Sequence, residues 1–186
     1  MTDQLYVFID NSFLFIEGYK HVRSVANLPA TKKPQIDYFK LKRFIEGHGE
    51  VKRIVLVGSE LAGSLITNCQ RAGFEVFTLP KYPDIKSGTN REKGVDQKIG
   101  WEVAKTIFTN KDPVPSKKII LCTGDKDFAS ILPDIHTSNW GFELWLWHGS
   151  FSPAFATQVK VFGTLRELDA EWKKFINVVD VKPRTP

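Results

Sequence analysis

Residues 119–131 read IILCTGDKDFASI, an apolar run that stops at Gly124 and is followed at once by two acids, Asp125 and Asp127. A short, continuous apolar run is typical of a strand buried on both faces of a parallel sheet. If the next residues begin a helix, both carboxylates lie at the carboxyl end of that strand, where open α/β sheets place their ligands. Asp125 and Asp127 are therefore the first candidates for a site.

The rest of the chain alternates between apolar runs and stretches with helical spacing. The predicted strands are residues 5–9, 51–57, 74–79, 118–122 and 142–147. The predicted helices are residues 12–19, 36–45, 60–72 and 95–108, one that begins near 127, and 152–159 and 165–176. This alternation predicts right-handed crossovers and an α/β fold. We expect three layers, Rossmann-like, with a central, mostly parallel five-stranded sheet in the order 3-2-1-4-5. Residues 1–176 are predicted to form one domain and 177–186 a C-terminal tail.

Composition limits the classes of protein that fit. The 186 residues include 26 Lys and Arg and 21 Asp and Glu, a net charge of +5, which permits a polyanionic partner without requiring one. No stretch approaches the roughly 18 apolar residues of a membrane span, and the N-terminal segment does not resemble a signal peptide. Cys69 and Cys122 lie among apolar residues, which predicts buried, reduced thiols and a cytoplasmic setting without a membrane partner.

The polar segment between Pro80 and Gly94 is a predicted loop, and loops of this length in compact domains are often functional. Its basic side chains make it a candidate flap that contacts phosphates. They are Lys81, Lys86, Arg91 and Lys93. Two acids in the same segment dilute the charge, so a solvated surface loop is an equally weighted alternative.

Acids recur at one edge of the predicted sheet. Asp10 follows the first strand, and Asp96 stands at the start of the helix over 95–108. Strands one and four are neighbours in the predicted order, so Asp10 should meet Asp125 and Asp127. Gathered carboxylates repel one another, and a hard divalent cation offsets the repulsion. Oxygen ligands without His or Cys suit Mg²⁺ or Mn²⁺, and such ions support phosphodiester hydrolysis. The alternative is that these acids only stabilise helix starts.

Three segments of the chain resemble, in order and spacing, the signature blocks of the NYN domain family of PIN-like ribonucleases. They are VFIDNSFLFIEG (7–18), KGVDQKIG (93–100) and LCTGDKDFASIL (121–132). The resemblance spans roughly residues 5–148. It implies a PIN-like fold, divalent-metal-dependent cleavage of RNA, and a role in RNA processing or turnover. By position, it implies an acidic, metal-binding catalytic site with two polar neighbours. The acids are Asp10, Asp96, Asp125 and Asp127, and the neighbours are Asn11 and Thr123.

Two positions differ from the pattern that the resemblance implies. Phe13 stands where many members of the family have Asn, and Lys126 separates the paired aspartates where a small residue is common. Lys126 either contacts phosphate or points to solvent. Glu102, six residues beyond Asp96, lies on a different face of an ideal helix and is expected to support the site indirectly at most. These departures favour the alternative function, a catalytically weak or inactive PIN-like module that binds RNA.

The expected partner is single-stranded RNA. Trp140, Trp145 and Trp147 are candidates for stacking on its bases, with packing in the core as the alternative for at least one of them. A nucleotide-binding domain is a weaker hypothesis, because neither GxGxxG nor GxxxxGK[ST] follows a strand. The sequence leaves the oligomeric state open, with a homodimer among the options.

Overall fold

A six-stranded, wholly parallel sheet forms the centre of the computed structural model, which describes residues 2–83, 90–92, 94–111 and 116–181. From one edge to the other, its strands are β4 (Glu75–Leu79), β3 (Glu50–Ser59), β1 (Gln4–Asp10), β7 (Lys117–Cys122), β8 (Gly141–Leu146) and β9 (Thr164–Glu167). The first five reproduce the predicted order. The prediction of five strands was short by one, because β9 extends the sheet beside β8.

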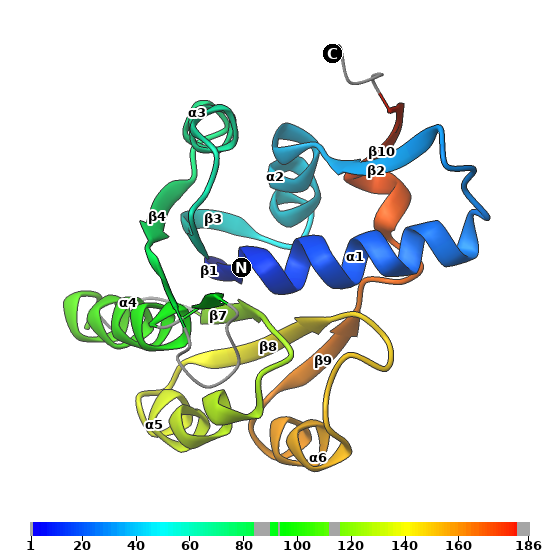
Figure 1. Cartoon of the computed structure of the whole chain (residues 1–186). Helices are drawn as coiled ribbons and strands as arrows, with labels where there is room; N and C mark the ends of the chain where they lie inside the picture. The colour runs from blue at the N-terminus through cyan, green and yellow to red at the C-terminus, as the bar shows by residue number, and fades with distance from the viewer. Residues whose placement is uncertain (1, 84–89, 93, 112–115, 182–186) are drawn as a thin grey trace.

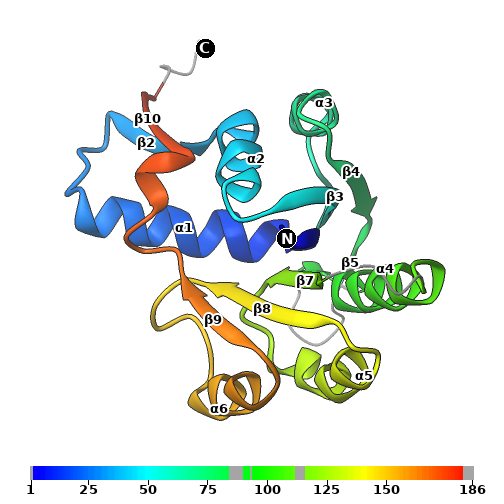
Figure 2. The same cartoon turned by 180° about the vertical axis from the view of Figure 1, so that it is seen from behind.

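Helices cover both faces of this sheet, which gives the predicted three layers (Figures 1 and 2). One face carries α1 (Asn11–Val25), α2 (Tyr38–Glu46) and α3 (Gly63–Arg71), and the other α4 (Val95–Thr109), α5 (Leu132–Thr137) and α6 (Pro153–Phe162). Strand β1 shows why both faces need cover. Leu5, Val7 and Ile9 point into one core, whereas Tyr6 and Phe8 point into the other. Such a strand is apolar throughout, as its sequence indicates.

Shorter elements complete the fold. Strand β2 (Lys32–Ile36) pairs antiparallel with β10 (Ile176–Asp180), and β5 (Lys81–Pro83) pairs antiparallel with β6 (Asn90–Glu92). The 3₁₀ helices are η1 (Lys126–Ile131) and η2 (Trp172–Lys174). The β5–β6 pair lies in the chain between the carboxyl end of β4 and the start of α4, within the predicted loop over 80–94.

The helix predicted over 165–176 is wrong. Its residues form β9, η2 and the start of β10, and Leu165 pairs with Leu144 of β8. Pairing with a buried strand overrides a local pattern that fits helical spacing. Asn177 to Asp180, placed in the tail, pair with β2, so the boundary at residue 176 falls inside a strand.

The three tryptophans considered for RNA stacking lie in the core. Trp140, Trp145 and Trp147 are all buried, with Trp145 and Trp147 among the most deeply buried large side chains. They are therefore not available to bases. Cys69 and Cys122 are free thiols and buried, as predicted. In the part of the chain that the structure describes, no helix is long and apolar enough to cross a membrane.

Candidate acidic site at the carboxyl edge of the sheet

Asp10 and Asp125 leave two adjoining strands at the same edge of the sheet. Ile9 of β1 is in register with Cys122 of β7, so Asp10 lies level with Thr123, two residues before Asp125. Neighbouring strands are about 4.8 Å apart. Burial, and also the negative charge of the neighbouring Asp10, raise the pKa of the Cys122 thiol. This edge between β1 and β7 is the switch point at which the strand order reverses.

Asp10 also caps α1. Its Oδ1 accepts hydrogen bonds from the backbone N–H of Ser12 at 2.9 Å, from that of Phe13 at 3.2 Å and from the Ser12 hydroxyl at 2.6 Å. The capping role raised as an alternative in the sequence is therefore real. Asn11 is buried, and its Oδ1 accepts a hydrogen bond from the Tyr38 hydroxyl at 3.2 Å. Asp10 and Asn11 thus fix the start of α1 at the edge of the sheet.

A tight turn sets the position of Asp125. The buried Thr123 hydroxyl accepts a hydrogen bond from the Asp125 N–H at 3.2 Å, and Asp125 Oδ1 accepts one from the Asp127 N–H at 2.8 Å. Asp125 therefore caps η1, and Asp127 lies in its first turn. Asp125 is partly buried, whereas Lys126 and Asp127 are exposed.

Phe13 and Gly124 pack together under this turn. A Cβ atom at Gly124 would overlap the backbone oxygen of Ser150 and lie 2.6 Å from Cε2 of Phe13. Phe13 is partly buried and packs against both cores. The Phe13 ring therefore fills the space beside the turn that carries Asp125, and only glycine fits at position 124.

Gly124→Ala is expected to lower the free energy of unfolding by about 1 to 3 kcal/mol, the usual cost of overpacking. The methyl group would meet backbone, which cannot rotate away. Gly100→Ala is the matched control, because a Cβ there meets nothing within 4 Å, and it should stabilise α4 by roughly 0.5 to 1 kcal/mol. Urea unfolding of both variants measures the difference. Equal stabilities would contradict the packing described for Gly124.

Asp96 lies at the same edge on another element. Lys98 Nζ is 3.8 Å from the ring centroid of Phe77, which is in register with Val57 of β3, while Thr106 contacts Arg53, four residues earlier on β3. Helix α4 therefore runs antiparallel to the strands, with its start at their carboxyl ends. Asp96 is exposed in the first turn.

The donor chemistry at this edge fits a hard divalent cation, because Asp10, Asp125 and Asp96 offer only carboxylate oxygens. Their carboxylate groups do not surround a single point. Among the described residues, no group of three or more His, Cys, Asp or Glu side chains is arranged to hold a metal. The sequence prediction of the four acids as metal ligands remains a prediction.

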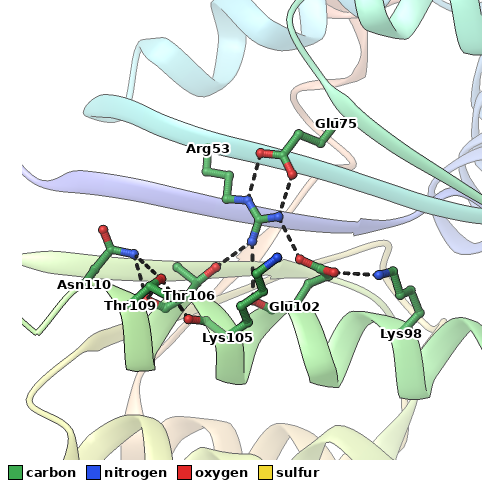
Figure 3. A network of polar contacts seen from close by, with 8 residues as sticks. All are labelled: Arg53, Glu75, Lys98, Glu102, Lys105, Thr106, Thr109 and Asn110. Atoms are coloured by element: carbon green, nitrogen blue, oxygen red, sulfur yellow. Dashed lines mark hydrogen bonds and ion pairs between the residues drawn. The ribbon is translucent and has the colours of Figure 1, made fainter.

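A network of ion pairs holds α4 against the sheet (Figure 3). Arg53 of β3 bonds Glu75 of β4 through Nε at 2.9 Å and through Nη2 at 2.5 Å. The same Nη2 lies 2.7 Å from Glu102, which also pairs with Lys98 at 2.6 Å, and Nη1 donates to the Thr106 hydroxyl at 2.7 Å. The Glu102 side chain is only 3% exposed. Glu102 therefore acts on the position of α4, and through it on Asp96.

The network should make stability depend on pH. Burial raises the pKa of Glu102, but hydrogen bonds from Lys98 and Arg53 outweigh it, so the pKa lies below its ordinary value of 4.5. The carboxylate therefore stabilises the fold above about pH 4.5, and this contribution is lost as the pH falls through the lowered pKa. The difference in unfolding free energy between wild type and Glu102→Gln should be constant near neutral pH and shrink below about pH 4. A difference that widens on acidification would contradict this.

A shallow depression opens beside Asp125. Its volume is about 520 Å³, and it is lined by Glu17, Gly124, Asp125, Lys126 and residues 149–152. Lys126 thus faces the same space as Asp125. Glu17 was not identified from the sequence, although it lies seven residues, about two turns, after Asp10 on the helix that Asp10 caps.

The predicted basic flap is described only in part. Lys81 begins β5, and the backbone of Arg91 belongs to β6. Lys86 and Lys93 lie outside the described residues. Because β5 follows β4 and β6 precedes α4, this strand pair leaves the sheet at the same edge as the acids. A role in binding phosphates stays a prediction.

The doubly wound sheet with acids at its switch point defines an α/β domain of the class that binds ligands at this edge. A model of the NYN domain matches residues 5–166, so the chain belongs to the NYN domain family, whose members are generally nucleases. Among solved structures, the chain is similar to a Vibrio parahaemolyticus protein of unknown function, with a TM-score of 0.62 and 16% identity over 95% of this chain and 97% of that chain. This likeness shows the fold alone. No curated protein shows significant sequence similarity.

Proposed function

We propose that the protein is a divalent-metal-dependent ribonuclease that hydrolyses single-stranded RNA at the acidic edge between β1 and β7. The observation that carries the proposal is the register of Ile9 with Cys122, which brings Asp10 and Asp125 to adjoining strand ends in a chain of a nuclease family. Hydrolysis adds one water across the phosphodiester bond. In the cell, we propose that this activity serves RNA processing or turnover in the cytoplasm.

Four acids would hold Mg²⁺ or Mn²⁺ in this proposal. Asp10 and Asp125 would hold the ion from the ends of β1 and β7, and Asp96 and Asp127 would complete the set from α4 and η1. When bound, the cation would lower the pKa of a water and offset charge on the leaving oxygen. The capping roles of Asp10 and Asp125 support this, because hydrogen bonds from the backbone hold each carboxylate in a fixed position at the sheet edge.

The other residues would bind the RNA or hold the acids in place. Lys126, in the depression beside Asp125, supplies a positive charge for a phosphate next to the cleaved bond. Thr123 and Asn11 set the orientation of the two acids through the turn and the start of α1. Lys81 begins β5 at the same edge, from which it would approach the phosphates that follow, and Arg91 of the paired strand β6 is a second basic residue proposed for this role.

A second candidate function is RNA binding without turnover. The observation in its favour is that, among the described residues, the acids do not form a gathered group of three, and that Asp10 and Asp125 both already serve as caps. This candidate predicts RNA binding that weakens steeply with salt and no cleavage with any divalent cation.

One assay separates the two. End-labelled single-stranded RNA, structured RNA and DNA of the same sequence are incubated with the protein and Mg²⁺, Mn²⁺ or EDTA. The ribonuclease hypothesis predicts cleavage of the single-stranded RNA with either cation, weaker cleavage of structured RNA and DNA, and none in EDTA. Cleavage that persists in EDTA, or no cleavage under any condition, would exclude metal-dependent hydrolysis.

A further inference from the structure

A groove lies on the α1 face of the sheet, between α1, β2, α2 and α3. Its volume is about 330 Å³, close to the lower end of the roughly 300 to 1,000 Å³ typical of small-molecule sites. That space suits a single nucleoside and excludes a duplex. We call it the α1–α3 groove. The residues that line it and carry the argument are Phe15, Tyr19, Lys33, Tyr38, Ser64 and Asn68.

The exposed Phe15 and the half-buried Tyr19 form one wall of the groove. Phe15 is 46% exposed, although it lies on a helix with a well-packed face. The centroids of the Phe15 and Tyr19 rings are 6.0 Å apart with a 40° angle between their planes, so the two rings do not stack face to face on each other. An aromatic ring at such a wall offers a surface on which a nucleic-acid base can stack, and stacking tolerates any base.

The charge around the groove favours a polyanion. Lys33 lies in the lining, and among the described residues that line the groove none is acidic. The Arg23 guanidinium lies 5.8 Å from the centroid of the Tyr19 ring and donates to the Tyr19 hydroxyl at 3.3 Å. The opposite wall carries the polar side chains of Ser64 and Asn68, which can hydrogen-bond the edge of a base.

The groove and the acidic site both adjoin the first turns of α1. Tyr38 lines it and donates its hydroxyl hydrogen to Asn11, the residue after Asp10. Phe15 stands four residues beyond Asn11 on α1, which is roughly 6 Å along the helix axis. Figure 1 shows that α1 starts at the end of β1 and runs beside β2 and α2. Phe15 lies five residues beyond Asp10, a rise of roughly 7.5 Å along α1, so an RNA strand at Asp10 would reach it in about one to two nucleotides by passing around the start of the helix.

We infer that the α1–α3 groove binds one unpaired base of the RNA strand, stacked on Phe15, next to the phosphodiester at the acidic edge. The inference rests on the proposed function for the identity of the polymer. It assigns a role in recognition to a surface that no sequence signal indicates. It also gives a physical reason for selecting single-stranded RNA, because a paired base cannot enter the groove.

The test is binding of a fluorescein-labelled 12-nucleotide single-stranded RNA in EDTA, followed by fluorescence anisotropy, so that cleavage does not interfere. Phe15→Ala should raise Kd about 5- to 100-fold. Phe15→Trp should keep Kd close to that of wild type, because it preserves stacking. Phe39→Ala is the matched control, since Phe39 is 48% exposed on α2 outside the lining of the groove. Its Kd should not change. Thermal melting verifies that each variant is folded.

An unchanged Kd for Phe15→Ala, or an equal loss in Phe39→Ala, would overturn the inference. A duplex of the same length should bind wild type and Phe15→Ala alike, and a loss with duplex as large as that with single-stranded RNA would also overturn it. Cleavage is scored separately with Mn²⁺. If Phe15 controls binding but wild type does not cleave, the groove stands and the proposed hydrolysis fails. If wild type cleaves and Phe15→Ala binds normally, the hydrolysis stands and the groove fails.

Discussion

Asp125→Asn and Asp10→Asn are each expected to reduce Mn²⁺-dependent RNA cleavage on the order of 100-fold or more, the loss that corresponds to several kcal/mol of transition-state stabilisation. Asparagine caps a helix about as well as aspartate, so the hydrogen bonds that each carboxylate accepts from the backbone can persist. The substitution thus removes the charge and keeps the start of α1 or η1. Single-turnover cleavage and thermal melting, measured on the same samples, separate the loss of chemistry from the loss of fold.

Asp37→Asn is the matched control for these variants. Asp37 caps α2 by accepting a hydrogen bond from the Lys40 N–H at 3.0 Å, and its other oxygen accepts one from Asn177 at 3.3 Å. The Asp37→Asn substitution should leave cleavage unchanged. If Asp37→Asn lowered cleavage as much as Asp125→Asn, a general effect of charge would explain the loss, and the proposed site would not. Full activity in Asp125→Asn would remove that residue from the mechanism.

Arg53→Met is expected to lower the free energy of unfolding by about 2 to 3 kcal/mol. Breaking a buried ion pair typically costs roughly 3 to 5 kcal/mol, but here Lys98 still neutralises Glu102, and the Arg53 side chain is 17% exposed. Because α4 loses its hydrogen bonds with Arg53, Asp96 at its start is expected to shift, and cleavage should fall as well. Chemical denaturation measures the first effect and single-turnover kinetics the second.

The neighbouring residue on β3 supplies the control. Lys52 forms an exposed pair with Glu50, with side chains 36% and 55% exposed, so Lys52→Met should change stability by less than about 1 kcal/mol. The double variant Arg53→Met with Glu102→Leu should lose clearly less than the sum of the single losses, because each single substitution already removes the Arg53–Glu102 pair. Additive losses would mean that the two side chains do not stabilise the fold as a pair.

Most of the sheet could be predicted from the sequence, because its strands are buried on both faces and therefore read as unbroken apolar runs. The run before Asp10 and the run before Gly124 are the clearest cases, and their order in the sheet follows from right-handed crossovers. The elements at the edges of the fold were harder to predict from the sequence. The helical spacing over 165–176 gave way to pairing with β8, and strand β2 contains Pro34 and alternates with exposed polar residues.

The site could be predicted only in outline. Strand ends carry Asp10 and Asp125 to one edge, and this follows from the order of the strands. The role of Glu102 in a network with Arg53 depends on how α4 packs across the sheet, which no local pattern reveals. No local pattern reveals either that Phe15 is exposed while all three candidate tryptophans are buried. An apolar side chain looks the same in a sequence whether it faces the core or the solvent.

The most direct test of the central claim is an anomalous difference map from crystals soaked in Mn²⁺. The account predicts a peak at the edge between β1 and β7, with carboxylate oxygens of Asp10 and Asp125 within roughly 2.0 to 2.3 Å of the ion, and no such peak in crystals of Asp125→Asn. A map without a peak at this edge at saturating Mn²⁺, or one whose peak is unchanged in Asp125→Asn, would contradict it.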